Sequence, residues 1–272
     1  MHIKATLTGG VLYAALAAFV AASVLVRRPH SIRLGRMLAG AAGGGLTLAL
    51  VARAIRLNQA PLQNMFEVFL FMAACSVPFA RTFRGNESFG PADAPTGGTG
   101  ESLDYVLGAV LLIPAGFVFP EAPRLLPPAL RSPLFIPHVT AYLASYLILT
   151  RAAWRSFPLA RGRMDERFAH AREREIHRLL RAGYPLLTLG LVLGAWWGKL
   201  AWGDFWNWDP KELWALTTWM VYTAWLHDRA GGGARHPRRM AAWAIAGWIC
   251  ILLTLTWVNL ARVFSGLHSY AR

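Results

Sequence analysis

The sequence predicts an all-α integral membrane protein with about eight transmembrane helices and both termini on the outer (periplasmic) side. Of the 272 residues, 55% are apolar and only 15% are charged. The charged residues are confined to short runs between long apolar stretches, which is the pattern of a chain that crosses a bilayer several times. The uneven distribution of Lys and Arg among these runs predicts the orientation.

Eight apolar segments approach the length of a membrane span, which is roughly 20 residues with about 17 as a lower limit. The predicted spans are about 5–26, 37–55, 62–80, 103–119, 138–153, 183–200, 211–227 and 241–260. Polar residues interrupt the third span, and the fifth is short. No small-residue cleavage site follows the first segment, and Arg27 and Arg28 lie on its far side. We therefore expect this segment to be a helix of the protein and not a cleavable signal.

Lys and Arg are concentrated on one side of the predicted membrane. The connections 27–36, 80–102, 151–182 and 228–240 contain 19 of the 28 Lys and Arg residues. Positive charge accumulates on the cytoplasmic side, so these connections are predicted to lie inside and both termini outside. The net charge of +14 is then mainly a topology signal. It predicts anionic lipid as a partner of the basic inner loop and no nucleic-acid binding.

We expect one polytopic membrane domain, residues 1–272, with three distinctive loops. The outer loop 120–137 is rich in proline and leucine, which suggests a surface lying against the bilayer or covering a ligand. The basic cytoplasmic loop 155–182 mixes Arg with Asp and Glu and is compatible with a surface helix. The outer loop 201–210 is rich in tryptophan. Cys75 and Cys250 are predicted to be packing residues, because no Cys-x-x-Cys pair is present.

The tryptophan-rich loop is the most informative segment. Trp202, Trp206 and Trp208 lie in it, and eight of the twelve Trp residues fall between positions 196 and 225. An aromatic belt at a membrane interface needs only one or two Trp per helix end. A flat surface for a large planar ligand, such as haem, explains the density better, with an interfacial belt as the alternative. Asp209, Pro210 and Glu212 also predict a helix start, with Asp209 as the N-cap.

Two histidines on the same predicted side are candidate axial ligands of haem iron. His138 opens the fifth span, and His268 lies in the C-terminal tail. Neutral imidazole is a common axial ligand, and two His would fill both axial positions. Each His alone is more simply an interfacial residue; together, near the tryptophan-rich loop, they favour ligation. The outer cations are candidates for the haem propionates: Arg124, Arg131, Lys199, Lys211 and Arg262.

His227 and Glu67 are candidates at other places. His227 ends the seventh span at its inner end, either as an interfacial His or as one ligand of a second haem site. A partner subunit or water would have to supply the other ligand. Glu67 lies near the outer start of the third span, where a buried carboxylate is costly. It is either structural, satisfied by Asn64 or a helix cap, or related to haem. The remaining histidines are expected to be solvated: His2, His30, His170, His177 and His236.

These residues resemble a known family. Residues 202–209, with the pattern Trp-Gly-x-x-Trp-x-Trp-Asp, are similar to the tryptophan-rich (WWD) signature of the haem-handling proteins of cytochrome c maturation. The continuation through residues 209–214 and Leu226-His227 resembles the CcsA/ResC branch (System II) more than CcmC or CcmF. The resemblance extends from Pro61 to Tyr270, roughly three quarters of the chain.

The resemblance implies a function and a set of partners. Family members move haem b to the outer face of the bacterial inner (cytoplasmic) membrane and present it to the Cys-x-x-Cys-His motif of apocytochrome c. They do so as one half of a haem lyase (holocytochrome c synthase) complex with a CcsB/ResB protein, and a thioredoxin-like apocytochrome reductant is a further implied partner. Carried over to this chain, the signature Trp202, Gly203, Trp206, Trp208 and Asp209 binds haem. His138 and His268 become its axial ligands, and His227 belongs to a transmembrane haem site whose other ligand comes from CcsB/ResB.

Three other functions remain open at this point. The first is a related membrane protein that regulates haem synthesis and does not attach haem, but the intact tryptophan signature argues against this alternative. A b-type electron-transfer protein normally needs facing His pairs within the bilayer, and only His227 lies near such a position. A transporter unrelated to haem is disfavoured by the lack of paired buried charges in the predicted spans.

Overall fold

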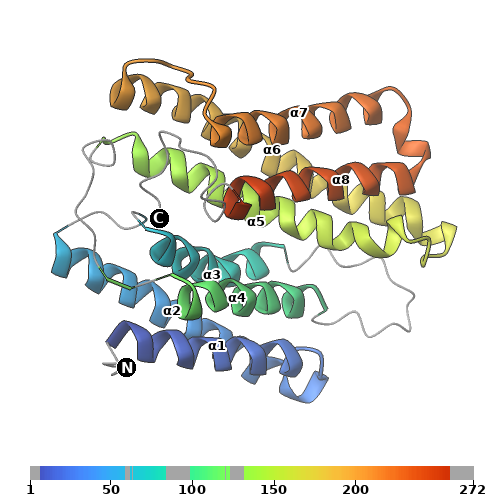
Figure 1. Cartoon of the computed structure of the whole chain (residues 1–272). Helices are drawn as coiled ribbons and strands as arrows, with labels where there is room; N and C mark the ends of the chain where they lie inside the picture. The colour runs from blue at the N-terminus through green and yellow to red at the C-terminus, as the bar shows by residue number, and fades with distance from the viewer. Residues whose placement is uncertain are drawn as a thin grey trace. The chain divides into compact units, whose positions relative to one another are not determined.

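The computed structural model describes residues 7–58, 62, 64–83, 99–119, 121–122 and 132–257 of the chain. Every regular element among these residues is a helix. The chain divides into two compact units, residues 1–125 and 126–272 (Figure 1).

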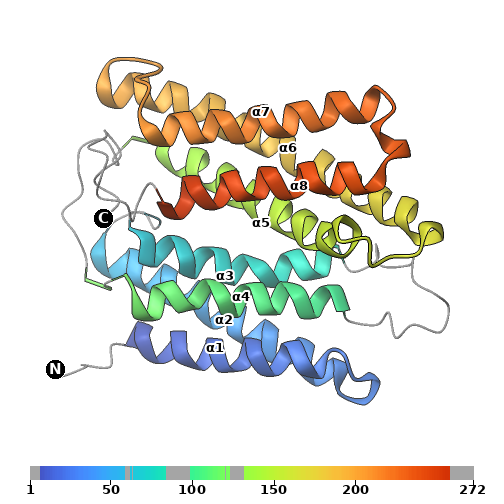
Figure 2. The same ribbon diagram turned by 45° about the vertical axis from the view of Figure 1, so that its right-hand side comes forward.

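Unit 1 is a bundle of four helices. They are α1 (Leu7–Leu25), α2 (Ile32–Leu57), α3 (Met65–Thr82) and α4 (Thr99–Phe117), and the short 3-10 helix η1 (Pro29–Ser31) links the first two. Each helix packs against its neighbour in sequence, and α4 packs back against α1 (Figure 2). The core contains fully buried Phe19, Leu46, Leu70 and Leu112. Outward-facing apolar residues on α2, such as Met37 and Leu48, are each 70% exposed, as expected for helices that face lipid.

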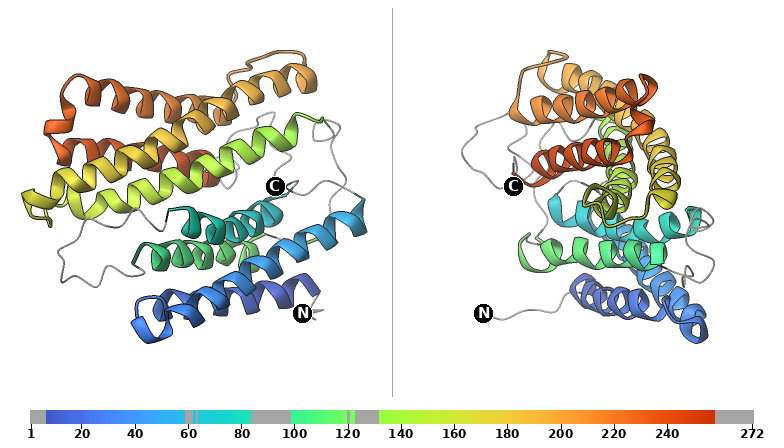
Figure 3. Two further views of the ribbon diagram at one scale, coloured as in Figure 1. Left: turned by 180° about the vertical axis from the view of Figure 1, so that it is seen from behind. Right: turned by 90° about the vertical axis from the view of Figure 1, so that its right-hand side faces the viewer.

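Unit 2 contains four further α-helices: α5 (Phe135–Ala160), α6 (Glu166–Trp202), α7 (Pro210–Ala230) and α8 (Pro237–Leu252). The 3-10 turn η4 (Gly233–Arg235) precedes α8, and the π-helical segment η5 (Leu253–Trp257) follows it. Helices α5 and α6 lie side by side along much of their length (Figure 3), and α8 packs against both α5 and α7. Trp197, Tyr222 and Trp225 are the largest fully buried side chains of this unit.

The predicted class, an all-α membrane protein, is confirmed. Every regular element among the described residues is a helix, and several of these helices are long and apolar enough to cross a membrane. Each of the eight predicted spans overlaps one α-helix of the described residues. Five helical segments are both long and apolar enough to cross a membrane: 29–57, 65–82, 100–117, 168–202 and 237–255. Helices α1, α5 and α7 lie outside this group, so the number of spans stays a prediction. The side on which the termini lie also stays a prediction.

The predicted basic loop 155–182 is mostly helical. Helix α5 continues to Ala160, and α6 begins at Glu166 and runs for 37 residues. Ion pairs allow charged residues into these helices: Arg155 Nε lies 3.3 Å from Glu175 Oε1, with both side chains under 10% exposed. Arg229 Nε of α7 lies 2.7 Å from Glu173 Oε1. The sequence prediction ended the spans where charge begins, whereas these charges neutralise one another inside the unit.

Cys75 and Cys250 are free thiols, half-buried in α3 and α8, as predicted for packing residues. His177 was expected to be solvated, which is wrong. Its ring is half-buried in α6 and stacks on Trp225, with ring centroids 5.5 Å apart and planes 24° apart.

Candidate functional site

The tryptophan-rich loop connects α6 to α7 in unit 2 (Figure 1). Helix α6 ends at Trp202, and Gly203 follows with φ +94°, a left-handed conformation that glycine adopts without strain. Lys199 Nζ donates to the Gly203 carbonyl oxygen at 2.5 Å and lies 5.6 Å from the centre of the Phe205 ring. These contacts hold the first half of the loop against the end of α6.

The second half of the loop is held by the start of α7, which confirms the predicted helix cap. Asp209 is the N-cap, and its Oδ1 accepts from the Lys211 backbone N–H at 2.8 Å. The Glu212 carboxylate reaches back, and its Oε2 accepts from the backbone N–H groups of Asn207 at 2.8 Å and Asp209 at 3.2 Å. Asp209 is buried, with 6% of its surface exposed, and its side chain caps α7.

Trp208 lies between the two backbone groups that Glu212 holds. Its φ is +58°, a conformation that is rare for a bulky residue and costs about 1–3 kcal/mol. The hydrogen bonds to Glu212 on both sides offset this cost. The result is a Trp208 side chain that is 67% exposed, with Trp206 edge-on to it at 6.1 Å between ring centroids. The loop therefore leaves a large aromatic surface exposed.

Glu212→Ala should release this loop. The substitution removes the acceptor for two backbone donors, and loss of a helix cap alone costs about 1 kcal/mol. Hydrogen exchange measured by mass spectrometry should show amides of residues 203–209 exchanging about tenfold faster or more, because 1.4 kcal/mol corresponds to tenfold. Glu212→Gln keeps an acceptor oxygen and is the matched control. Equal exchange in the Ala variant and the wild type would show that Glu212 does not hold the loop.

His138 lies in the first turn of α5, and its ring packs against residues of α6. Its Nδ1 is 2.9 Å from the Gly190 carbonyl oxygen. The ring stacks on Trp197 at 5.6 Å with planes 17° apart, and Tyr142 meets it edge-on at 5.1 Å. A Cβ on Gly194 would lie 2.5 Å from His138 Cε1. The absence of a side chain at position 194 therefore makes room for the imidazole.

Trp197 connects His138 to the tryptophan-rich loop. This side chain is 1% exposed and belongs to a buried apolar cluster with Phe135. Its other neighbour is Trp202, which meets it edge-on with ring centroids 4.7 Å apart. An unbroken series of ring contacts thus runs from His138 through Trp197 to Trp202. The structure thus links the predicted ligand His138, through Trp197, to Trp202, the first tryptophan of the predicted platform.

His227 lies near the opposite end of α7 from the loop. It is 17 residues beyond Pro210, which corresponds to roughly 25 Å along a helix. The side chain is exposed, and its Nδ1 lies 2.9 Å from the carbonyl oxygen of Thr223 in the preceding turn. His227 and the tryptophan-rich loop therefore lie at opposite ends of α7, and the second haem site stays a prediction.

Several predicted residues lie outside the part of the chain that the structure describes. His268 is among them, so the structure does not place the second predicted axial ligand. The same holds for Arg124, Arg131 and Arg262, three of the five cations considered for the propionates. Of the other two, Lys199 is occupied with the loop carbonyl described above, and Lys211 lies in the first turn of α7.

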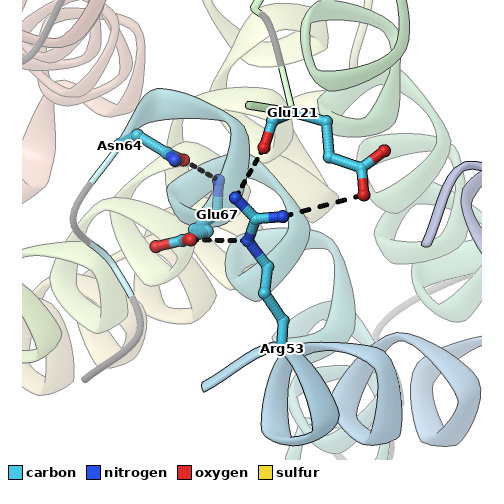
Figure 4. A network of polar contacts seen from close by, with 4 residues as sticks. All are labelled: Arg53, Asn64, Glu67 and Glu121. Carbon is cyan, nitrogen blue, oxygen red and sulfur yellow. Dashed lines mark hydrogen bonds and ion pairs between the residues drawn. The ribbon is translucent and has the colours of Figure 1, made fainter. Parts of the chain in front are cut away.

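Glu67 belongs to unit 1, where it is part of a buried polar network (Figure 4). Its Oε1 accepts from Arg53 Nε at 2.7 Å, and both side chains are less than 10% exposed. Arg53 Nη2 donates to the Glu121 carbonyl oxygen at 2.6 Å, and Nη1 lies 3.7 Å from Glu121 Oε1. Asn64 is the N-cap of α3 and accepts from the Glu67 backbone N–H. These contacts favour the structural alternative for Glu67.

Sequence reasoning missed several residues of these two sites. Trp197 was counted only as one of many tryptophans, and Arg53 was hidden within a predicted span. Gly190 and Gly194 are spaced four residues apart on α6, a pattern that allows close approach of a neighbouring helix or side chain. This spacing was the one signal in the sequence that a neighbouring helix or side chain packs closely against α6 near the tryptophan-rich loop.

The sequence of this chain matches known proteins over most of its length. A sequence profile described as "Cytochrome C assembly protein" matches residues 38–265. The cytochrome c biogenesis protein CcsA of Chlamydomonas reinhardtii is 30% identical over 91% of this chain and 71% of its own length. CcsA of Synechococcus sp. (strain CC9902) is 32% identical over 89% of this chain and 87% of its own length.

A solved structure, described as the cytochrome c haem lyase CcmF, has a similar fold. The TM-score is 0.62, and the match covers 94% of this chain. Sequence identity is only 16%, so the likeness concerns the fold alone. This chain spans about half, 48%, of that longer protein.

Proposed function

Because the chain belongs to the cytochrome c assembly protein family and is of the CcsA type, we propose that it carries haem to the outer face of a bacterial cytoplasmic membrane and presents it to apocytochrome c. Cytochrome c biogenesis is the function of the family, and the chain is an all-α membrane protein. The proposal concerns the finer steps: which residues hold haem, on which side, and with which partners.

One observation carries the proposal above all others. The ring contacts from His138 through Trp197 to Trp202 connect an imidazole to the start of the tryptophan-rich loop, which supports the proposal. An interfacial belt needs aromatic rings at the membrane surface, but it does not require a histidine packed against one of these rings. A haem platform needs both an aromatic surface for the ring and an imidazole for the iron.

The described residues fit haem as a ligand. Phe205 and Trp208 are 58% and 67% exposed, so they offer flat apolar surface for the porphyrin. His138 is the proposed ligand on one side of the iron, and His268 is the proposed ligand on the other. The proposed binding surface consists of Trp202, Gly203, Trp206, Trp208 and Asp209, with Asp209 acting as the cap that shapes the loop.

The proposed chemistry is addition of two cysteine thiols of apocytochrome c across the two vinyl groups of reduced haem b. Each addition forms one thioether bond, and the thiol proton ends on the vinyl carbon that is not bonded to sulfur. The protein would contribute position: the loop holds the ring while one edge stays accessible to the thiols. Ligation by two histidines would keep the iron reduced until the histidine of the substrate replaces one of them.

The second proposed site is at His227. Its Nδ1 contact with the Thr223 carbonyl and its exposed ring are compatible with a haem shared with another chain. We propose a CcsB/ResB-type membrane protein as this partner, so that the two chains together form a haem lyase complex. A thioredoxin-like reductant that keeps the apocytochrome thiols reduced completes the proposed set of partners.

The first test is the visible absorption spectrum of the protein purified from membranes, with and without a co-expressed CcsB/ResB partner. The proposal expects a reduced b-type spectrum that weakens or shifts in His138→Ala and Trp208→Ala variants. His170→Ala is the control, since His170 is an exposed residue near the other end of α6. A wild-type complex without haem would contradict the proposal and leave the tryptophans as an interfacial anchor.

A further inference from the structure

We propose that helix α6 sets the tautomer and the plane of the His138 ring before haem binds, through the Gly190 carbonyl, the bare Cα of Gly194 and the Trp197 ring. The inference rests on the proposed function, because it concerns the residue that would ligate the haem iron. Gly190, Gly194 and Trp197 are positioning residues, which act through His138.

The Gly190 carbonyl selects the tautomer. It lies 2.9 Å from His138 Nδ1, and a carbonyl oxygen can only accept a hydrogen bond. Nδ1 is therefore the protonated nitrogen of the neutral ring, and the acceptor lone pair lies on Nε2. A metal-binding histidine that donates from its other nitrogen to a carbonyl is fixed in orientation and made a stronger ligand. Gly190 thus prepares Nε2 as the ligand atom.

Trp197 and Tyr142 set the plane of the ring. Trp197 stacks at 17° to the imidazole, and Tyr142 stands at 86° to it. Trp197 is 1% exposed and cannot turn without opening the apolar cluster around Phe135. Because Trp202 packs edge-on against Trp197, the plane of the His138 ring is fixed relative to the start of the tryptophan-rich loop.

Gly194 provides the space that this arrangement needs. A Cβ at this position would lie 2.5 Å from His138 Cε1 and 2.8 Å from Nδ1, closer than real Cβ atoms approach other heavy atoms. The backbone of α6 is held by its own hydrogen bonds, so the ring would have to move. Movement of the ring breaks the contact with Gly190 and the stack on Trp197. Gly194→Ala should therefore displace the ligand without removing it.

Gly183→Ala is the matched control on the same helix. A Cβ on Gly183 would lie 2.9 Å from Leu149 Cδ2, so the substitution also crowds the contact between α5 and α6. It lies about three helical turns from Gly194 and its crowding falls on an aliphatic side chain. The two variants share the added methyl group and differ in whether it meets His138.

The first experiment titrates haem into the full chain purified with its partner. Gly194→Ala should retain haem about tenfold more weakly or worse, the usual effect of disturbing the residues behind a metal ligand. Added imidazole should restore the reduced low-spin spectrum, and Gly183→Ala should behave as the wild type. Wild-type haem affinity and spectrum in Gly194→Ala would overturn the inference. A wild-type protein that takes up no haem would instead contradict the proposed function.

The second experiment needs no haem and does not depend on whether Gly194→Ala folds. Nitrogen-15 chemical shifts of the imidazole in haem-free wild-type protein report which ring nitrogen is protonated. A His138→Gln sample, in which one signal disappears, assigns the resonance among the eight histidines of the chain. We expect the Nδ1–H tautomer. An Nε2–H tautomer, or an equal mixture, would overturn the inference whatever the haem titration shows.

Discussion

Replacement of His138 or His268 by alanine should abolish cytochrome c synthesis and leave any bound haem readily oxidised. With one imidazole removed, the iron loses one of two strong axial ligands, and water or oxygen can take the open position. The aromatic surface of the tryptophan-rich loop remains, so some haem should still be retained. The measurement combines the yield of holocytochrome in cells with the spectrum of the purified complex before and after exposure to air.

Imidazole in the medium distinguishes a lost ligand from a damaged fold. A small free imidazole can occupy the vacated position and should restore synthesis in either variant, whereas it cannot repair packing. His170→Ala, at an exposed residue of α6, should keep full activity with or without imidazole. Unchanged activity in both His138→Ala and His268→Ala would remove the ligand assignment.

Local signals in the sequence were sufficient to predict the tryptophan-rich loop and the start of α7. Asp209, Pro210 and Glu212 specify a helix start through contacts between residues that are close in sequence, and the structure contains the predicted capping box. Local hydropathy also predicted a segment overlapping each of the eight α-helices of the described residues, five of which are long and apolar enough to cross a membrane. Their ends were less accurate where charge was taken as a boundary.

Contacts between distant residues could not be predicted in this way. Trp197 lies 59 residues from His138, and nothing in either segment specifies that the two rings stack. Arg53 and Glu67 lie on different helices, and an isolated buried charge is penalised in a hydropathy argument, whereas the pair is neutral. Paired charges also explain why the sixth span was predicted to begin only at residue 183, although α6 begins at Glu166. Glu173 and Glu175 are paired with arginines of α7 and α5.

Arg53→Met should destabilise unit 1 strongly. The substitution leaves the Glu67 carboxylate, which is 5% exposed, without its cation, and breaking one side of a buried ion pair costs about 3–5 kcal/mol. Arg56→Met is the matched control, because Arg56 is an exposed arginine one turn further along α2. The chain offers a reporter for each unit: Cys75 lies in unit 1, whereas Cys250 and all twelve tryptophans lie in unit 2.

In a Cys250→Ala background, labelling of Cys75 by a thiol reagent therefore reports changes in unit 1 alone. Arg53→Met should speed labelling of this half-buried thiol, and Arg56→Met should not change it. A rate in Arg53→Met equal to that of the control would show that the ion pair adds nothing to the stability of unit 1. Tryptophan fluorescence, measured in parallel, shows whether unit 2 has changed.

A double variant separates the two roles considered for Glu67. Arg53→Met with Glu67→Leu replaces the pair by apolar side chains, which is often neutral for stability and can even be stabilising. We expect slow labelling of Cys75 to return, since neither charge is then left buried alone. If Glu67 is structural, the haem spectrum of the double variant should equal that of the wild type. If Glu67 acts on haem directly, stability should return while the spectrum stays altered, because a restored fold cannot replace a missing carboxylate.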